Sequence, residues 1–113
     1  MKIVSQQVTL YELRQMATRM FGDMVKAVVD VDKEILAVDA ELHSDLQALL
    51  IDNGSLPQSL WGVRLYPGRE GEGFVEFRSK INVRPAQGNR SLGVESAETR
   101  DRILRVLAKR IQS

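Results

Sequence analysis

The stretch MVKAVVDVDKEILAVD, residues 24–39, decides the fold of this chain. It contains two runs of β-branched and apolar residues, 24–30 and 34–39, joined by a short charged turn. This pattern predicts a β-hairpin. Because Val28 and Val29 put apolar groups on both faces of the first strand, we expect the hairpin to lie centrally in a sheet that is covered on both sides.

Helical patterns flank this hairpin in the sequence. Before it, Thr9 and Glu12 have the spacing of a capping box, and apolar residues recur at helical intervals up to Gly22. After it, residues 40–53 carry a stripe of leucines at positions 42, 46, 49 and 50, and Gly54 supplies a stop signal. We therefore expect one amphipathic helix before the hairpin and one after it.

A second hairpin is predicted in the C-terminal half, with strands at residues 60–67 and 74–85 around a glycine-rich tip. In the later strand, alternation places four apolar residues on the core face: Val75, Phe77, Ile81 and Val83. The even-numbered residues from Glu76 to Arg84 then share the opposite face. A third helix is expected to follow a cap near Ser96.

The order of these elements predicts an α+β fold in a single domain over residues 1–113. The expected sheet is antiparallel or mixed, has four to five strands from two hairpins, and packs with three helices. The chain has no cysteine, which excludes disulfides, thiol catalysis and cysteine-ligated metals. It also lacks an apolar signal segment and any run of about 18 apolar residues, so we expect a cytoplasmic protein without membrane contact.

Charge is unevenly distributed along the chain, although the net charge is only +1. Residues 1–56 carry 5 basic and 9 acidic groups, whereas residues 57–113 carry 11 basic and 6 acidic groups. Such asymmetry can indicate an anionic partner. It can equally let the two halves of one fold attract each other, or let two copies of the chain associate.

The loop that follows the last predicted strand, residues 85–95, is the main candidate for a binding site. Gly88 permits a positive φ, so successive backbone amides and neighbouring side chains can form a concavity that binds an anion. Arg84 enters the loop, and its guanidinium matches carboxylate or phosphate geometry. The candidate ligand-binding residues are Glu76, Asn82, Arg84, Gln87, Asn89, Arg90 and Ser91. Alternatively, the same polar side chains cap the final helix and bond their own backbone.

His43 is the only histidine of the chain. On a helix, residues two apart point about 200° away from each other, so Glu41, His43 and Asp45 do not converge as metal ligands. A boundary histidine satisfied by one hydrogen bond is the simpler interpretation. The acidic turn near Asp32 lacks the glycine and distal glutamate of a calcium loop. We therefore expect no metal and no cofactor.

Four segments, 20–30, 41–45, 60–67 and 74–91, together resemble a family of small prokaryotic proteins known as domain of unknown function 5674. The most distinctive of them is the run INVRPAQGNRS, in which a strand leads into a Pro, Gln, Gly, Asn, Arg, Ser loop. The resemblance spans nearly the whole chain and implies a bacterial protein. It implies no substrate and no catalytic residues, but it draws attention to the same strand and loop.

We expect a binding or regulatory module that recognises an anionic group on a small ligand or protein partner, and not an enzyme. Nucleic acid is less favoured as the partner, because only 5% of the residues are aromatic. The alternative is a small hydrolase or nuclease-like enzyme in which Glu76 or His43 is the acid or base and Arg84 stabilises a developing anion. A shared pocket for these three residues would favour the enzyme. The sequence leaves the oligomeric state open.

Overall fold

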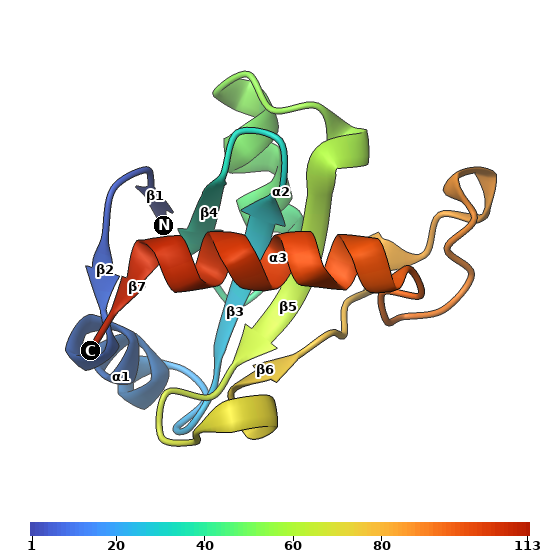
Figure 1. Cartoon of the computed structure of the whole chain (residues 1–113). Helices are drawn as coiled ribbons and strands as arrows, with labels where there is room; N and C mark the ends of the chain where they lie inside the picture. The colour runs from blue at the N-terminus through green and yellow to red at the C-terminus, as the bar shows by residue number, and fades with distance from the viewer.

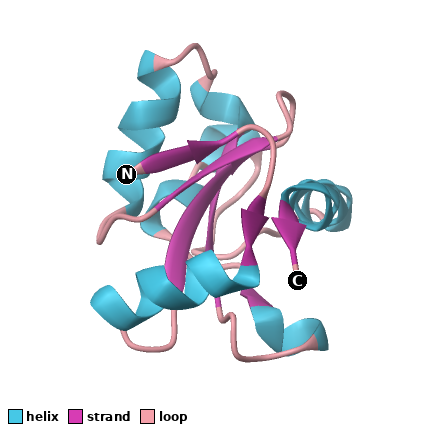
Figure 2. Ribbon diagram, turned by 90° about the vertical axis from the view of Figure 1, so that its left-hand side faces the viewer, coloured by secondary structure: helices cyan, strands magenta, loops and turns pink.

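Residues 1–113 form, in a computed structural model, a five-stranded sheet with helices on both faces (Figure 1, Figure 2). The strand order is β1-β4-β3-β5-β6, and all four pairings are antiparallel. The strands are β1 (Lys2–Val4), β3 (Val25–Asp30), β4 (Ile35–Val38), β5 (Leu60–Leu65) and β6 (Val75–Glu76). The helices are α1 (Leu10–Arg19), α2 (His43–Asp52) and α3 (Ala97–Arg110). The predicted α+β fold is confirmed.

The central hairpin is confirmed as β3 and β4, and β3 is the middle strand of the sheet. Its turn is held by Asp30, which is 1% exposed. One carboxylate oxygen accepts from the backbone N–H of Asp32 and Lys33, at 3.0 and 2.9 Å, and the other from the Ser55 hydroxyl at 2.6 Å. The acidic turn is thus stabilised by its own hydrogen bonds.

Both faces of the sheet are buried, as the paired valines predict. Val29 belongs to a core of 18 buried residues that packs the sheet against α1 and α3. Val28, the next residue, points the other way into a core of six buried residues under α2. Alternate side chains of a strand point to opposite faces, so adjacent apolar residues require cover on both.

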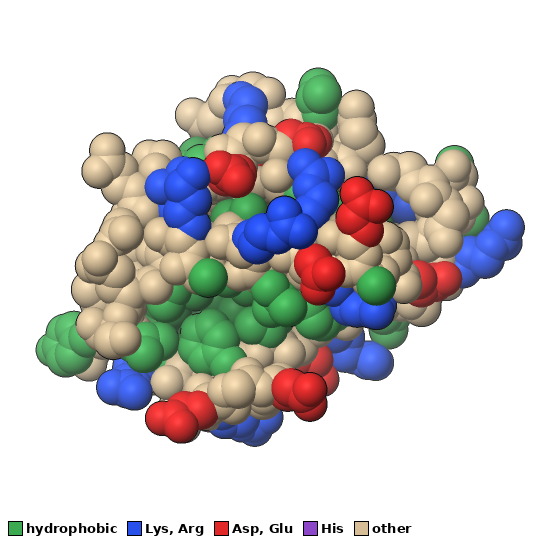
Figure 3. All heavy atoms as spheres, viewed as in Figure 1, with side chains coloured by type: hydrophobic (Ala, Val, Ile, Leu, Met, Phe, Trp, Pro, Cys, Tyr) green, Lys and Arg blue, Asp and Glu red, His purple; other side chains and the backbone are tan.

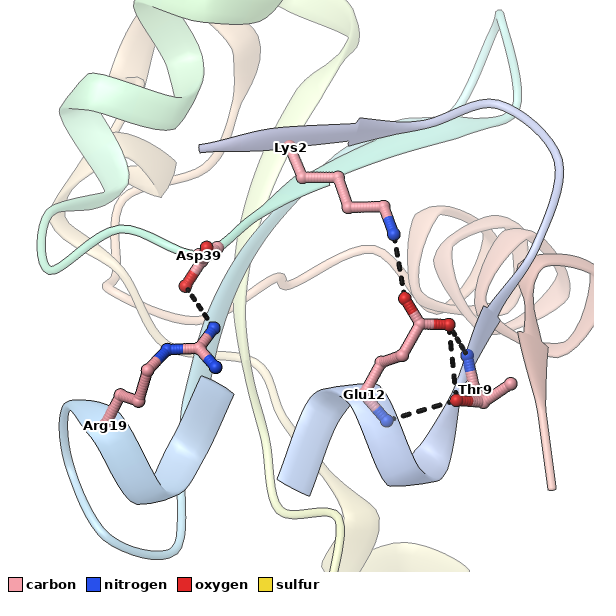
Figure 4. Close-up of polar contacts among 5 residues, drawn as sticks. All are labelled: Lys2, Thr9, Glu12, Arg19 and Asp39. Carbon is pink, nitrogen blue, oxygen red and sulfur yellow. Dashed lines mark hydrogen bonds and ion pairs between the residues drawn. The ribbon is translucent and has the colours of Figure 1, made fainter. Parts of the chain in front are cut away.

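The predicted capping box at the start of α1 is confirmed (Figure 4). The Thr9 hydroxyl accepts from the backbone N–H of Glu12 at 3.1 Å, and the Glu12 carboxylate accepts from the backbone N–H of Thr9 at 3.2 Å. The same carboxylate pairs with Lys2 of β1 at 2.8 Å, and the hydrogen bond from Lys2 lowers the pKa of Glu12. Farther along α1, Arg19 lies 3.5 Å from Asp39 and ties the helix to the end of β4.

The second predicted helix begins later than the leucine stripe indicated. The helix α2 starts at His43, and Leu42 precedes it with its side chain 55% exposed. No side chain caps this helix N-terminus. The start of α3 follows the prediction, because Ser96 accepts from the backbone N–H of Thr99 at 3.2 Å.

A small two-stranded sheet, absent from the prediction, joins the chain ends. It pairs β2 (Val8–Thr9) with β7 (Ile111–Gln112) in parallel. None of the helices has the length and apolar character needed to cross a membrane.

The predicted strand over residues 74–85 is wrong beyond Glu76. Two short 3₁₀ turns replace it, Lys80–Asn82 and Pro85–Gln87. The predicted alternation, with Val83 on the core face and Asn82 on the opposite face, is wrong as well. Asn82 is fully buried, whereas Val83 is 43% exposed. Within this segment, only Val75 and Glu76 pair with β5 in the sheet.

Candidate functional site

Beyond the end of β6, no strand pairs with this edge of β5, and side chains form hydrogen bonds with its backbone instead. The side-chain amide of Asn82 accepts from the backbone N–H of Gly62 at 2.8 Å and donates to the Gly62 carbonyl at 3.0 Å. Two residues later, Arg84 donates to the carbonyl of Leu60. Asn82 and Arg84 therefore occupy the place of a neighbouring strand, which satisfies polar groups that would otherwise be buried without partners.

Arg84 is half-buried and has no acidic partner. Its guanidinium stacks on the ring of Trp61 at 3.9 Å, donates to the carbonyl of Pro57 at 3.0 Å, and lies 3.4 Å from the Gln87 side-chain oxygen. None of the six ion pairs of the protein includes it. Its Nε is buried without a hydrogen-bond partner, and desolvation lowers the pKa of Arg84. Its positive charge is thus uncompensated within the chain.

Asn89 holds the predicted loop together from inside. It is 4% exposed, donates to the carbonyls of Asn82 and Gly93 at 2.7 and 2.8 Å, and accepts from the backbone N–H of Glu95 at 2.9 Å. Gly88 has φ of 83°, the left-handed conformation that the sequence predicts there. The turn is therefore a fixed structure that keeps Gln87 and Arg84 in place.

The loop does contain an anion-binding concavity, and it holds a carboxylate of the protein. The backbone N–H groups of Arg90 and Ser91 donate to one carboxylate oxygen of Glu95, at 2.7 and 2.8 Å. The hydrogen bond from the Arg90 backbone is the main reason that the pKa of Glu95 is lowered. These two amides are consequently engaged in the free protein.

A polar cleft opens beside the turn, with a volume of about 230 Å³. We call it the turn cleft, and its walls include Gln58, Trp61, Gln87, Asn89, Thr99 and Arg102. Of the sequence candidates it includes Gln87 and Asn89, whereas Arg84 does not line it but stacks on Trp61, which does. Glu76, Asn82, Arg90 and Ser91 do not line it.

Most residues of the turn cleft were not predicted as site residues, among them Trp61 and Arg102. Trp61 is only 7% exposed, and its indole N–H makes no hydrogen bond within the chain. The buried side-chain atoms without a partner belong to Arg64 and Arg84, so this N–H is accessible at the cleft. Arg102 pairs with Asp32 at 2.7 Å, and hydrogen bonds from Ser59 first and Arg102 second lower the pKa of that carboxyl. The signal in the sequence was the single tryptophan, whose N–H needs an acceptor when it is buried.

His43 lies on the other face of the sheet, under the start of α2. Its Nε2 donates to the carbonyl of Val63 at 2.8 Å, as expected for a boundary histidine with one hydrogen bond. Burial is the main reason that the pKa of His43 is lowered to about 4, and the imidazole is therefore neutral at pH 7.

Glu76 is separate from both His43 and Arg84. Its carboxylate accepts from the Tyr66 hydroxyl at 3.0 Å and lies 3.4 Å from Arg64. No cavity is lined by His43, Glu76 and Arg84 together. The enzyme hypothesis therefore lacks the shared pocket on which it depended.

An apolar groove lies between α3 and the edge of the sheet, where hydrophobic side chains gather below the helix (Figure 3). Its walls include Phe74, Val75, Leu104, Leu107 and Ile111. Because its surface is mainly apolar, it is unsuited to an anionic group.

Comparison with known proteins places the chain in one family. No curated protein and no solved structure matches it. The model of the family described as "Protein of unknown function (DUF5674)" matches residues 2–110. The chain therefore belongs to DUF5674, the family that its strand and loop sequence resembles.

Proposed function

We propose that the protein is a binding module that recognises an anionic group, on a small ligand or a protein partner, at the turn cleft. The observation that carries this proposal is the uncompensated charge of Arg84, stacked 3.9 Å from the Trp61 ring that forms one wall of the cleft. Desolvating a cation without a counter-charge costs free energy. A bound anion would offset that cost.

Hydrogen-bond donors in the cleft support an anionic ligand. The indole N–H of Trp61 makes no hydrogen bond within the chain, and Gln87 and Thr99, which carry an amide and a hydroxyl, also line the space. The lining has one carboxylate, that of Asp32. Since Asp32 neutralises Arg102 at 2.7 Å, the positive charge of Arg84 remains in excess near the cleft. Charge-assisted hydrogen bonds are about twice as strong as neutral ones, so a carboxylate or phosphate suits this site better than a neutral polar group.

The proposal is tested by calorimetric titration with a panel of carboxylate and phosphate compounds at constant ionic strength. Thr99→Val keeps the shape of the side chain and removes its hydroxyl, and Gln87→Ala removes an amide. Each should weaken binding of a compound that occupies the cleft by about three- to tenfold, because one hydrogen bond contributes about 0.5–1.5 kcal/mol.

Arg105→Ala is the control for a general effect of charge on anion binding. Arg105 is exposed on α3, forms no ion pair and does not line the cleft. This variant should bind like the wild type. The proposal is wrong if no compound of the panel binds, or if Arg105→Ala weakens binding as much as the two cleft variants do.

A further inference from the structure

We propose that a second cavity, at the N-terminus of α2, binds the phosphate group of a small phosphate monoester. This α2 cavity has a volume of about 320 Å³ and lies on the opposite face of the sheet from α3 and the turn cleft. Its walls include Lys26, His43, Ser44, Arg64, Ser79 and Lys80. The inference is independent of the proposed function, because the two cavities share no residue.

Two of its cations are direct neighbours across the sheet. Lys26 of β3 and Arg64 of β5 are paired in the antiparallel register, so their side chains emerge side by side on the α2 face. Like charges directly opposite each other destabilise a sheet. An anion bound between the two side chains would attract both of them and offset their repulsion.

A third cation, Lys80, reaches the same cavity from the 3₁₀ turn that follows β6. Lys26 and Lys80 form no ion pair, although Lys26 lies 5.2 Å from the ring of Phe21. Only Arg64 has an acidic neighbour, Glu76, at 3.4 Å. Three cations and one carboxylate leave two positive charges, which match the charge of a phosphate monoester near pH 7.

The start of α2 adds hydrogen-bond donors. Because Leu42 has no polar side chain, the first backbone N–H groups of this ten-residue helix receive no side-chain cap. Such groups and the positive end of the helix dipole favour a bound phosphate. The acids near this end of α2 are Glu41, which precedes the helix, and Asp45 in its first turn; both are exposed, and neither lines the cavity.

His43 gives the cavity a neutral hydrogen-bond acceptor. The ring is 8% exposed, and its Nε2–H is fixed by the carbonyl of Val63 at 2.8 Å. The other nitrogen, Nδ1, then carries no proton and has no partner within the chain. It can accept from a hydroxyl group next to the phosphate, which favours a monoester over a simple divalent anion.

The base of the cavity is closely packed around Gly62. A Cβ atom at this position would lie 2.5 Å from the Ser79 Cβ and 3.2 Å from the His43 Cδ2. The absence of a side chain on this residue of β5 therefore lets Ser79 and His43 approach the strand from two different elements. The buried contacts of Ser79 and His43 fix this part of the cavity, which supports a site that is partly preformed.

The test uses the single histidine as its reporter. His43 ring signals are followed by NMR while inorganic phosphate or glycerol phosphate is added and ionic strength is kept constant with chloride. We expect saturable shifts, with glycerol phosphate, whose hydroxyl can donate to Nδ1, bound at least as tightly as inorganic phosphate. Lys26→Ala and Lys80→Ala should each weaken binding about tenfold, because each loses a charge-assisted contact.

Arg78→Ala is the matched control. Arg78 is exposed, lies two residues from Lys80 and does not line the cavity, so its removal should leave the affinity within twofold. Shifts that never saturate, or equal losses in Arg78→Ala and Lys80→Ala, would contradict the site. So would tighter binding of a single-stranded oligonucleotide than of glycerol phosphate, which would indicate a nucleic-acid surface.

The indole N–H of Trp61, the only tryptophan, separates this inference from the proposed function. Binding at the α2 cavity should shift the His43 signals and leave the Trp61 signal unchanged. If phosphate shifts Trp61 and not His43, it occupies the turn cleft and the α2 site does not exist.

Discussion

The side chain of Asn82 pairs with both backbone polar groups of Gly62, at 2.8 Å to the N–H and 3.0 Å to the carbonyl, and so acts as a strand neighbour for β5. Both residues are buried. The chain thereby keeps its central sheet satisfied although β6 ends after Glu76.

Asn82→Ala should lower the free energy of unfolding by about 2–4 kcal/mol, because it leaves two buried backbone groups without partners and each costs about 1–3 kcal/mol. Urea denaturation measures the change. Asn53→Ala is the control, since Asn53 is exposed and makes one bond, to the carbonyl of Leu49. A loss below 1 kcal/mol in Asn82→Ala would show that the amide is not a substitute for a strand.

Gly62→Ala should destabilise the protein by about 1–3 kcal/mol, because the new methyl group would overlap Ser79. The double variant with Ser79→Gly removes that overlap and should recover part of the loss. Gly68→Ala provides the control, since nothing lies within 4 Å of a Cβ there. Thermal unfolding is measured for the wild type, Gly62→Ala, Ser79→Gly, the double variant and Gly68→Ala, and a fully additive double variant would argue against the contact.

His43 should make the protein less stable as the pH falls. Its pKa is about 4 in the folded state and about 6.5 in the unfolded state, so protonation favours unfolding. The stability that the neutral ring provides is complete above pH 6.5 and is lost progressively toward pH 4. Between pH 7 and pH 4.5 the free energy of unfolding should fall by about 2 kcal/mol from this group alone.

The comparison with His43→Gln isolates this effect, because the chain has no other histidine. The variant should retain the loss due to carboxylates and lack the histidine contribution. Equal pH dependence in the two proteins, measured by urea denaturation at several pH values, would mean that the ring is not desolvated.

Glu95→Ala should expose the concavity formed by the backbone N–H groups of Arg90 and Ser91. Sulfate can then take the place of the missing carboxylate, as anions do at clustered amides. We expect sulfate to raise the melting temperature of Glu95→Ala more than that of the wild type, relative to chloride at equal ionic strength. Identical sulfate effects would show that these amides do not form an anion site.

The sequence predicted the starts of α1 and α3 correctly because their signals lie within a few residues of each other. Thr9 and Ser96 cap α1 and α3 as predicted because capping depends on residues three apart. The adjacent valines of β3 predicted cover on both faces. Leu42 misled the prediction because its spacing fits the helix, yet the chain enters the helical conformation only at His43.

The remaining differences depend on contacts between distant segments. The segment after β6 is held to β5 by the bond between Asn82 and Gly62, which are 20 residues apart. The pairing of β2 with β7 joins the two ends of the chain and has no local pattern. For the candidate site, the sequence indicated Arg84 and the loop. It did not show that Glu95 fills the concavity or that Trp61 borders a cleft.

The central claim is that the charge of Arg84 supports an anion in the turn cleft, and the Trp61 indole N–H signal tests it most directly. Arg84→Lys and Arg84→Gln both lose the guanidinium bonds to the carbonyls of Pro57 and Leu60, and they differ in charge. In a titration of both variants with the tightest anion of the panel, we predict saturable indole shifts and at least tenfold tighter binding to Arg84→Lys. Equal affinities, or an indole signal that does not move in the wild type, would contradict the claim.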